Sequence, residues 1–254
     1  MPNQPISRSA IVQALVRSLR PKRHVLALWE GGSASFDRVD RWSDLDLYVL
    51  VEGAKVLQTF QEIERALRAI SPISETYVVQ LGFEGVSQKF YKLRDAGEFA
   101  IVDLAVLTPE SREMFLAPEV HGKNVFHFNK SGAAKVRHLD RSAQAKKRRD
   151  RALRLKTRFA IFNNYVTKEI GRGHQLEALE DYRAITLSTL IEALRIRYTP
   201  VHFDFRAHYV DSELPPGVVK RLRRLSYVTD VSELREKYAE ATDWCREVLN
   251  AVAR

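Results

Sequence analysis

The sequence of 254 residues contains one cysteine, Cys245, and it lacks long apolar runs, internal repeats and low-complexity segments. A single cysteine excludes an internal disulfide, and with it the small disulfide-stabilised secreted domains. No apolar run approaches the roughly 20 residues that a transmembrane helix requires. The first residues also lack the basic and then apolar pattern of a secretory signal. We therefore expect a cytoplasmic globular protein with no membrane partner.

Basic side chains outnumber acidic ones: the sequence has 41 lysines and arginines and 32 aspartates and glutamates, which gives a net charge of +9. This excess favours anionic partners such as nucleotides, nucleic acid or acidic protein surfaces, although it could also serve solubility alone. The hydrophobic fraction of 45% is typical of a globular protein. A chain of this length can form one large domain or two modest ones.

A glycine-containing turn separates two apolar segments near the start of the chain. The first segment, residues 24–29, is followed after Glu30 by Gly31-Gly32-Ser33. The second segment, residues 45–51, is rich in β-branched and aromatic residues and is predicted to be a strand. A Gly-Gly-Ser turn can bring backbone N–H groups close to a phosphate. The turn is therefore a candidate phosphate-binding element.

Three aspartates lie at or within the apolar segments. Asp44 and Asp46 open the strand at 45–51, and side chains two residues apart on a strand point to the same face. Asp103 lies inside another apolar run, residues 99–107. Carboxylates near a core repel one another and are costly, so a cation is expected beside them, and Mg²⁺ prefers oxygen ligands. Surface aspartates capping a turn would explain Asp44 but not Asp103.

The spacing of Gly32-Ser33, ten intervening residues, Asp44-Leu45-Asp46 and a later Asp103 resembles the signature of the DNA polymerase β-type nucleotidyltransferase superfamily. It is most similar to the small bacterial branch of aminoglycoside and minimal nucleotidyltransferases, and the resemblance covers residues 24–107. It implies two Mg²⁺ ions, held by three aspartates that would also be catalytic: Asp44, Asp46 and Asp103. It also implies a nucleotide-binding set of Gly31, Gly32, Ser33 and Ser43.

The resemblance implies a nucleotidyltransferase that moves a nucleoside monophosphate, AMP from ATP as the expected case, to a hydroxyl group of a small molecule. An aminoglycoside-like acceptor is suggested by the resemblance alone. Transfer to a macromolecule, such as tRNA or a toxin protein, is one alternative. A non-catalytic nucleotide-binding partner resembling an antitoxin is another. Nucleic acid is possible as a partner but is not favoured, since no aromatic residues are interleaved with the basic ones. The sequence specifies neither the base nor the oligomeric state.

Alternation of helical and strand patterns predicts an α/β domain with a mixed sheet at residues 1–130, followed by a helical bundle at 131–254 that clamps nucleotide and acceptor. The predicted strands are 24–29, 45–51, 75–81, 89–93, 99–107 and 120–128. The predicted helices are 6–20, 54–70, 134–169, 175–198, 216–227 and 231–252.

Charged residues of the predicted helical bundle suggest two further roles. The resemblance to the aminoglycoside branch implies that a carboxylate there could act as general base, and the candidates are Glu177, Glu180, Asp181 and Glu192. Each is also explained as a solvated helix residue. The basic run 146–158 spreads around a helix, so only one stripe of it can face a ligand. Most of the run is interpreted as a solvated helix surface whose polar side chains cover apolar surface with their stems. One stripe, with Arg154 and Arg158 four residues apart, could face a triphosphate or an acidic acceptor.

Overall fold

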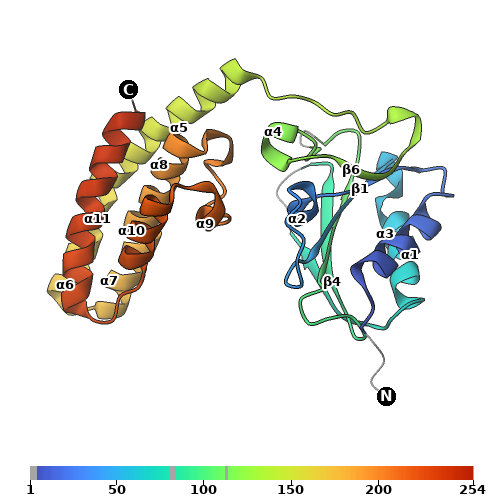
Figure 1. Cartoon of the computed structure of the whole chain (residues 1–254), viewed down its shortest axis with the longest axis horizontal. Coiled ribbons are helices and arrows are strands. Elements are labelled where there is room, and N and C mark those ends of the chain that lie inside the picture. The colour runs from blue at the N-terminus through green and yellow to red at the C-terminus, as the bar shows by residue number, and fades with distance from the viewer. Residues whose placement is uncertain (1–4, 81–83, 112–113, 254) are drawn as a thin grey trace. The chain divides into compact units, whose positions relative to one another are not determined.

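The computed structural model describes residues 5–80, 84–111 and 114–253, and the chain divides into two compact units, Met1–Leu139 and Asp140–Arg254 (Figure 1). We call them the sheet unit and the helical unit. The sequence analysis placed the division after residue 130. The difference arises because the side-chain amide of Asn129 hydrogen-bonds both the N–H and the carbonyl of Ala134, at 3.0 and 2.8 Å. Ala134 is thereby buried in the core of the sheet unit.

The sheet unit contains a six-stranded mixed sheet of order β3-β4-β5-β2-β1-β6. Its strands are β1 (Val25–Glu30), β2 (Leu45–Val51), β3 (Ile73–Val79), β4 (Val86–Leu93), β5 (Val102–Leu107) and β6 (Val125–Asn129). Strands β2 and β5 are parallel, and the other neighbours are antiparallel. These strands confirm the predicted α/β class with a mixed sheet. Residue 81, the last of the predicted strand 75–81, lies outside the described residues.

One face of the sheet is covered by α1 (Arg8–Leu19) and α3 (Val56–Arg68), which pack side by side in Figure 1. Leu45, Leu47 and Val49 of β2 are at most 2% exposed and belong to the same core as these two helices. Because side chains alternate along a strand, Asp46 points to the opposite face. Burial of the alternate apolar residues thus fixes which face carries the carboxylates.

Short elements lie between and beyond the strands of the sheet unit: α2 (Gly32–Ser35), η1 (Gly53–Lys55), α4 (Pro118–His121) and η2 (Lys130–Gly132). The predicted strand 120–128 is wrong in its first half, where α4 ends and the chain turns at Gly122. Gly122 has φ +72°, and a Cβ there would lie 2.5 Å from the carbonyl oxygen of Ser35. The turn therefore requires glycine, and β6 begins only after it.

The helical unit consists of α5 (Arg141–Phe162), α6 (Tyr165–Arg172), α7 (Gln175–Asp181), a π-helical turn η3 (Tyr182–Leu187), α8 (Ser188–Tyr198), η4 (Pro200–His202), α9 (Val210–Glu213), α10 (Pro216–Ser226) and α11 (Val231–Val252). The predicted helix 134–169 is two helices, because the buried side chain of Asn163 turns inward. Its amide donates to the hydroxyl groups of Tyr238 and Thr242, both at 3.0 Å. Within the described part of the chain, no helix has the length and apolar character needed to cross a membrane.

Candidate active site in the sheet unit

Asp46 and Asp103 are register partners on the parallel strands β2 and β5. Both side chains therefore point to the face of the sheet that α1 and α3 leave uncovered. Asp44 precedes β2 by one residue and is exposed. The structure thus places the three predicted aspartates at the start of two neighbouring strands, with two of them paired on one face.

Burial and neighbouring charges act together on the carboxyl groups of this face. Burial, followed by the charges of Asp44 and Asp103, raises the pKa of Asp46 to about 7. Burial also raises the pKa of Asp103, as does the charge of Asp44, while a hydrogen bond from Gln88 opposes the shift. That bond runs from Gln88 Nε2 to Asp103 Oδ1 over 2.6 Å. An additional cation would favour the charged form of both groups.

Both glycines of the turn after β1 are required by close contacts with β2. Gly32 has φ +53°, and a Cβ on it would overlap the carboxylate of Asp46. A Cβ on Gly31 would lie 2.6 Å from Cε2 of Tyr48. The N–H of Gly31 donates to the carbonyl of Asp46 at 3.0 Å. The turn is therefore held directly against the carboxylates, at a distance that side chains larger than hydrogen would not permit.

Ser33 and Ser43, both predicted to bind nucleotide, have different surroundings. The hydroxyl oxygen of Ser33 is buried and has no hydrogen-bond partner among the residues that the structure describes. Such an orphaned polar atom beside a glycine turn fits a phosphate oxygen. The hydroxyl of Ser43 instead donates to Asp40 Oδ1 at 2.9 Å and accepts from the Asp40 N–H at 3.0 Å. Ser43 therefore stabilises the loop that leads to Asp44.

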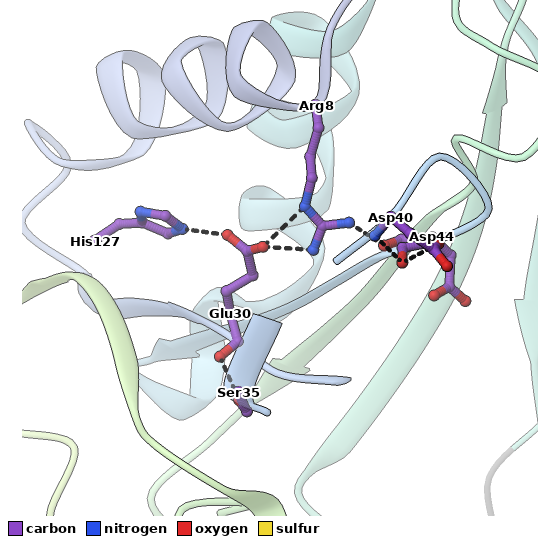
Figure 2. Close-up of polar contacts among 7 residues, drawn as sticks. Arg8, Glu30, Ser35, Asp40, Asp44 and His127 are labelled. Atoms are coloured by element: carbon purple, nitrogen blue, oxygen red, sulfur yellow. Dashed lines mark hydrogen bonds and ion pairs between the residues drawn. The ribbon is translucent and has the colours of Figure 1, made fainter. Parts of the chain in front are cut away.

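An ion-pair network that the sequence analysis missed supports this loop, as Figure 2 shows. Arg8 donates from Nε and Nη2 to Glu30 Oε1, at 3.0 and 2.5 Å, and its Nη1 donates to the carbonyl oxygen of Asp44. His127 Nε2 lies 3.0 Å from Glu30 Oε2. Burial alone would raise the pKa of Glu30, but hydrogen bonds from His127 and Arg8 lower it below its ordinary value. Arg8 therefore joins a buried carboxylate to the backbone of the aspartate loop.

The sequence contains one signal for this network: Glu30 is a charged residue at the end of an apolar strand and directly before Gly31. In the structure Glu30 is 7% exposed. Burial of a carboxylate requires a partner. Its partners Arg8 and His127 are 22 and 97 residues away in the sequence, so no local pattern could identify them.

The donor set suits Mg²⁺, although the protein alone does not form a complete cage. Across residues 5–80, 84–111 and 114–253, no group of three or more His, Cys, Asp or Glu side chains is placed to hold a metal ion. Mg²⁺ commonly binds through one or two carboxylates and completes its shell with substrate phosphates and water. The pair Asp46 and Asp103, beside the orphaned Ser33 hydroxyl, fits that mode of binding.

The four candidate general bases belong to the helical unit. Glu177, Glu180 and Asp181 lie on α7, and Glu192 lies on α8. Glu192 forms a bidentate pair with Arg151, whose Nε and Nη2 lie 2.5 and 2.8 Å from its two carboxylate oxygens. Both carboxylate oxygens of Glu192 are therefore engaged by Arg151 within the helical unit.

No protein-family model matches the chain, and no curated protein does. The chain is similar over most of its length to solved adenyltransferases. An aminoglycoside 6-adenyltransferase from Bacillus subtilis is 12% identical, with 98% of this chain and 90% of that chain covered and a TM-score of 0.35. A spectinomycin adenyltransferase from Enterococcus faecialis, with ATP and spectinomycin, is 12% identical, with 94% and 100% covered and a TM-score of 0.41.

A nucleotidyltransferase-like protein from Exiguobacterium sibiricum is 10% identical, with 96% of this chain and 75% of that chain covered and a TM-score of 0.40. Similarity at this level carries no argument about residues or activity. The functional argument therefore depends on the geometry of the site itself.

Proposed function

We propose that the sheet unit is the catalytic part of a nucleotidyltransferase that uses a nucleoside triphosphate and a divalent cation. The observation that carries this proposal is the pairing of Asp46 with Asp103 directly against the glycine turn and the orphaned Ser33 hydroxyl. Nucleotidyl transfer requires carboxylates that bind a metal and groups that bind phosphates, and both lie on one face of this sheet. ATP is the donor to test first, in line with the family resemblance.

In this proposal the residues have separate roles. Gly32 and Ser33 bind the outer phosphates of the triphosphate, through the backbone N–H groups of the turn and the Ser33 hydroxyl. Asp46 and Asp103 are the paired carboxylates that would hold Mg²⁺, and Asp44, which forms no three-carboxylate group with them in the described structure, is the third predicted ligand. The bound ion would neutralise phosphate charge and lower the pKa of the acceptor hydroxyl. Arg8 positions Asp44 through its carbonyl oxygen.

The reaction needs little covalent help from the protein. An acceptor hydroxyl oxygen forms a bond to the α-phosphorus, the bond from that phosphorus to the β-phosphate oxygen breaks, and pyrophosphate leaves. The hydroxyl proton passes to the carboxylate of Asp103, which lies on the same face of the sheet as Asp46. Orientation of the two substrates in line supplies the main part of the rate enhancement.

The proposal is tested by incubating the protein with Mg²⁺, each nucleoside triphosphate in turn and a library of hydroxyl-bearing acceptors. Mass spectrometry then detects nucleotidylated products, and a coupled assay detects pyrophosphate. Asp46→Asn and Asp103→Asn should each lower the rate by at least 100-fold. Glu75→Gln, an exposed change on β3, is the matched control and should leave it unchanged. Full activity of both aspartate variants would refute the assigned roles.

A further inference from the structure

The helical unit contains a cavity that its own residues line. Two adjoining spaces of about 350 and 670 Å³ share the lining residues Ser188, Glu192, Phe203, Asp204 and Arg206. All of the lining comes from α5, η3, α8, α10 and the segment after η4, so the cavity belongs to the helical unit alone. Its size suits a small molecule.

Cations dominate one wall of this cavity. Lys147, Arg151, Arg154 and Arg158 recur at helical spacing and form one stripe of α5. The stripe includes the predicted pair Arg154 and Arg158, which do line the same space. Arg151 is neutralised by Glu192. Arg154 makes no ion pair with any described residue, and the only side-chain bond of Arg158 in the described structure is a 3.5 Å contact with Thr189.

The remaining lining adds more positive charge than negative charge. Arg183 and Arg206 also line the cavity, so six cationic side chains face two acidic ones, Glu192 and Asp204. Glu192 is already paired with Arg151, so the lining of the cavity carries a net positive charge. Guanidinium groups in such numbers recognise phosphates, with which they form paired charge-assisted hydrogen bonds.

The floor of the cavity is apolar. Leu187 and Phe203 are each 5% exposed, and Ile191 lies beside them on α8. A π-helical turn, Tyr182–Leu187, supplies part of the lining and connects α7 to α8. Turns of this kind inside helices are frequent at functional sites, because the extra residue redirects side chains. The cavity therefore combines a cationic wall with an apolar one, and Lys147 Nζ lies over the Phe203 ring, 5.5 Å from its centroid.

A buried arginine fixes the shape of the last wall. Arg195 is fully buried and donates from Nε to the carbonyl of Arg206 at 2.7 Å and from Nη2 to the carbonyl of His208. Its Nη1 lies 2.8 Å from Glu213 Oε2. Arg206 has φ +53°, a conformation that persists in a non-glycine residue only where its surroundings hold it. The wall is thus preorganised, which lowers the entropy cost of binding.

We propose that this cavity is a binding site for a small organic phosphate with an apolar body, distinct from the nucleotide bound by the sheet unit. The phosphate contacts Arg154 and Arg158, and the apolar body lies on Phe203 and Leu187. The positive charge argues against a polycationic ligand such as an aminoglycoside. A concave, apolar-floored space suits a small molecule better than a nucleic-acid backbone, which needs an extended track. Only the assignment of the nucleotide to the sheet unit rests on the proposed function.

The test uses the full-length chain and one probe, 4-methylumbelliferyl phosphate, with 4-methylumbelliferyl glucoside as its uncharged counterpart. Calorimetric titration at pH 8 should show saturable binding of the phosphate at one site and binding at least tenfold weaker for the glucoside. Arg154→Ala with Arg158→Ala should weaken phosphate binding at least tenfold. The matched control is Arg149→Ala with Lys156→Ala, which removes the same charge from exposed positions of α5 outside the cavity and should change affinity less than twofold.

A second variant keeps every cation and fills the space instead. Ser188→Trp, at an exposed position shared by both parts of the cavity, should also weaken binding at least tenfold. Equal weakening by both arginine pairs, or no saturable binding, would overturn the proposal. Displacement of the probe by Mg²⁺·ATP would overturn it too, as would tighter binding of a 12-nucleotide RNA that both pairs weaken equally. Asp46→Asn should lose ATP binding and keep probe binding, so failure of the catalytic proposal remains distinguishable.

Discussion

Asp46 lies against the backbone of Gly32, so closely that a Cβ on the glycine would overlap its carboxylate, and on its other side it is the register partner of Asp103. This relationship joins the phosphate-binding turn to the carboxylate pair.

Replacement of Asp46 by asparagine should stabilise the metal-free protein at alkaline pH. The pKa of Asp46 is raised to about 7 from an ordinary value of 3.8. A raised pKa means that stability is complete below pH 4 and is lost as pH rises to 7 and the buried carboxyl group becomes charged. Three pKa units correspond to about 4 kcal/mol, so we expect a gain of roughly 2–4 kcal/mol at pH 8.

Urea unfolding in EDTA, at pH 4 and pH 8, measures this effect. The advantage of Asp46→Asn should be small at pH 4 and large at pH 8, while Glu75→Gln shows no such dependence. An equal advantage at both pH values would mean that the charge on Asp46 is not the cause.

Mg²⁺ and ATP should bind cooperatively. Because the described residues form no complete metal cage, Mg²⁺ alone should bind weakly, and substrate phosphates should complete its shell. Saturating ATP is expected to tighten Mg²⁺ binding at least tenfold. Binding at pH 6 should also release a proton, since the metal favours the charged form of Asp46. Calorimetry in two buffers of different ionisation enthalpy measures both effects, and tight binding of Mg²⁺ alone would contradict them.

Gly32→Ala should abolish nucleotide binding and destabilise the sheet unit by about 1–3 kcal/mol. The positive φ of Gly32 and its contact with Asp46 leave no room for a methyl group. Gly97→Ala is the matched control, because nothing lies within 4 Å of the added atom. Fluorescence titration with a labelled ATP analogue and urea unfolding measure the two effects. If Gly32→Ala binds ATP normally, the turn does not hold the phosphates.

Arg8→Ala should lower both stability and affinity for Mg²⁺·ATP. Its removal leaves Glu30, 7% exposed, with His127 as its remaining side-chain partner, at a cost of about 2–4 kcal/mol. Adding Glu30→Gln should restore much of the stability but not the affinity, since the carbonyl of Asp44 stays unanchored. Arg17→Ala, exposed on the same helix, is the control for unfolding and ATP titrations. Recovery of both properties in the double variant would limit Arg8 to a structural role.

Sequence reasoning predicted the parts of this site that depend on short local patterns of apolar and charged residues. The strand at Leu45–Val51 alternates between buried and half-buried residues over its first four positions, and burial of Leu45 and Leu47 fixes the direction of Asp46. Asp103 could be identified because a charged residue inside an apolar run is costly to bury unless it has a partner or binds a metal. The resemblance then placed the glycine turn beside them.

The parts that were missed depend on contacts across the chain. Gln88 reaches Asp103 from the neighbouring strand, and Arg8 reaches Asp44 from a helix 36 residues earlier. The predicted helix 134–169 is divided because Asn163 bonds to Thr242, 79 residues later. Helix periodicity alone contains no information about such partners, so it predicts the helices but not where tertiary hydrogen bonds divide them.

The central claim is that Asp46 and Asp103 together bind a divalent cation with the nucleotide. Electron paramagnetic resonance of Mn²⁺, titrated in the presence of a non-hydrolysable ATP analogue, tests it most directly. The account predicts that Asp103→Asn loses at least one bound Mn²⁺ ion, or binds it at least tenfold more weakly, whereas Glu75→Gln binds as the unmodified protein does. Unchanged number and affinity of bound ions in Asp103→Asn would contradict the account.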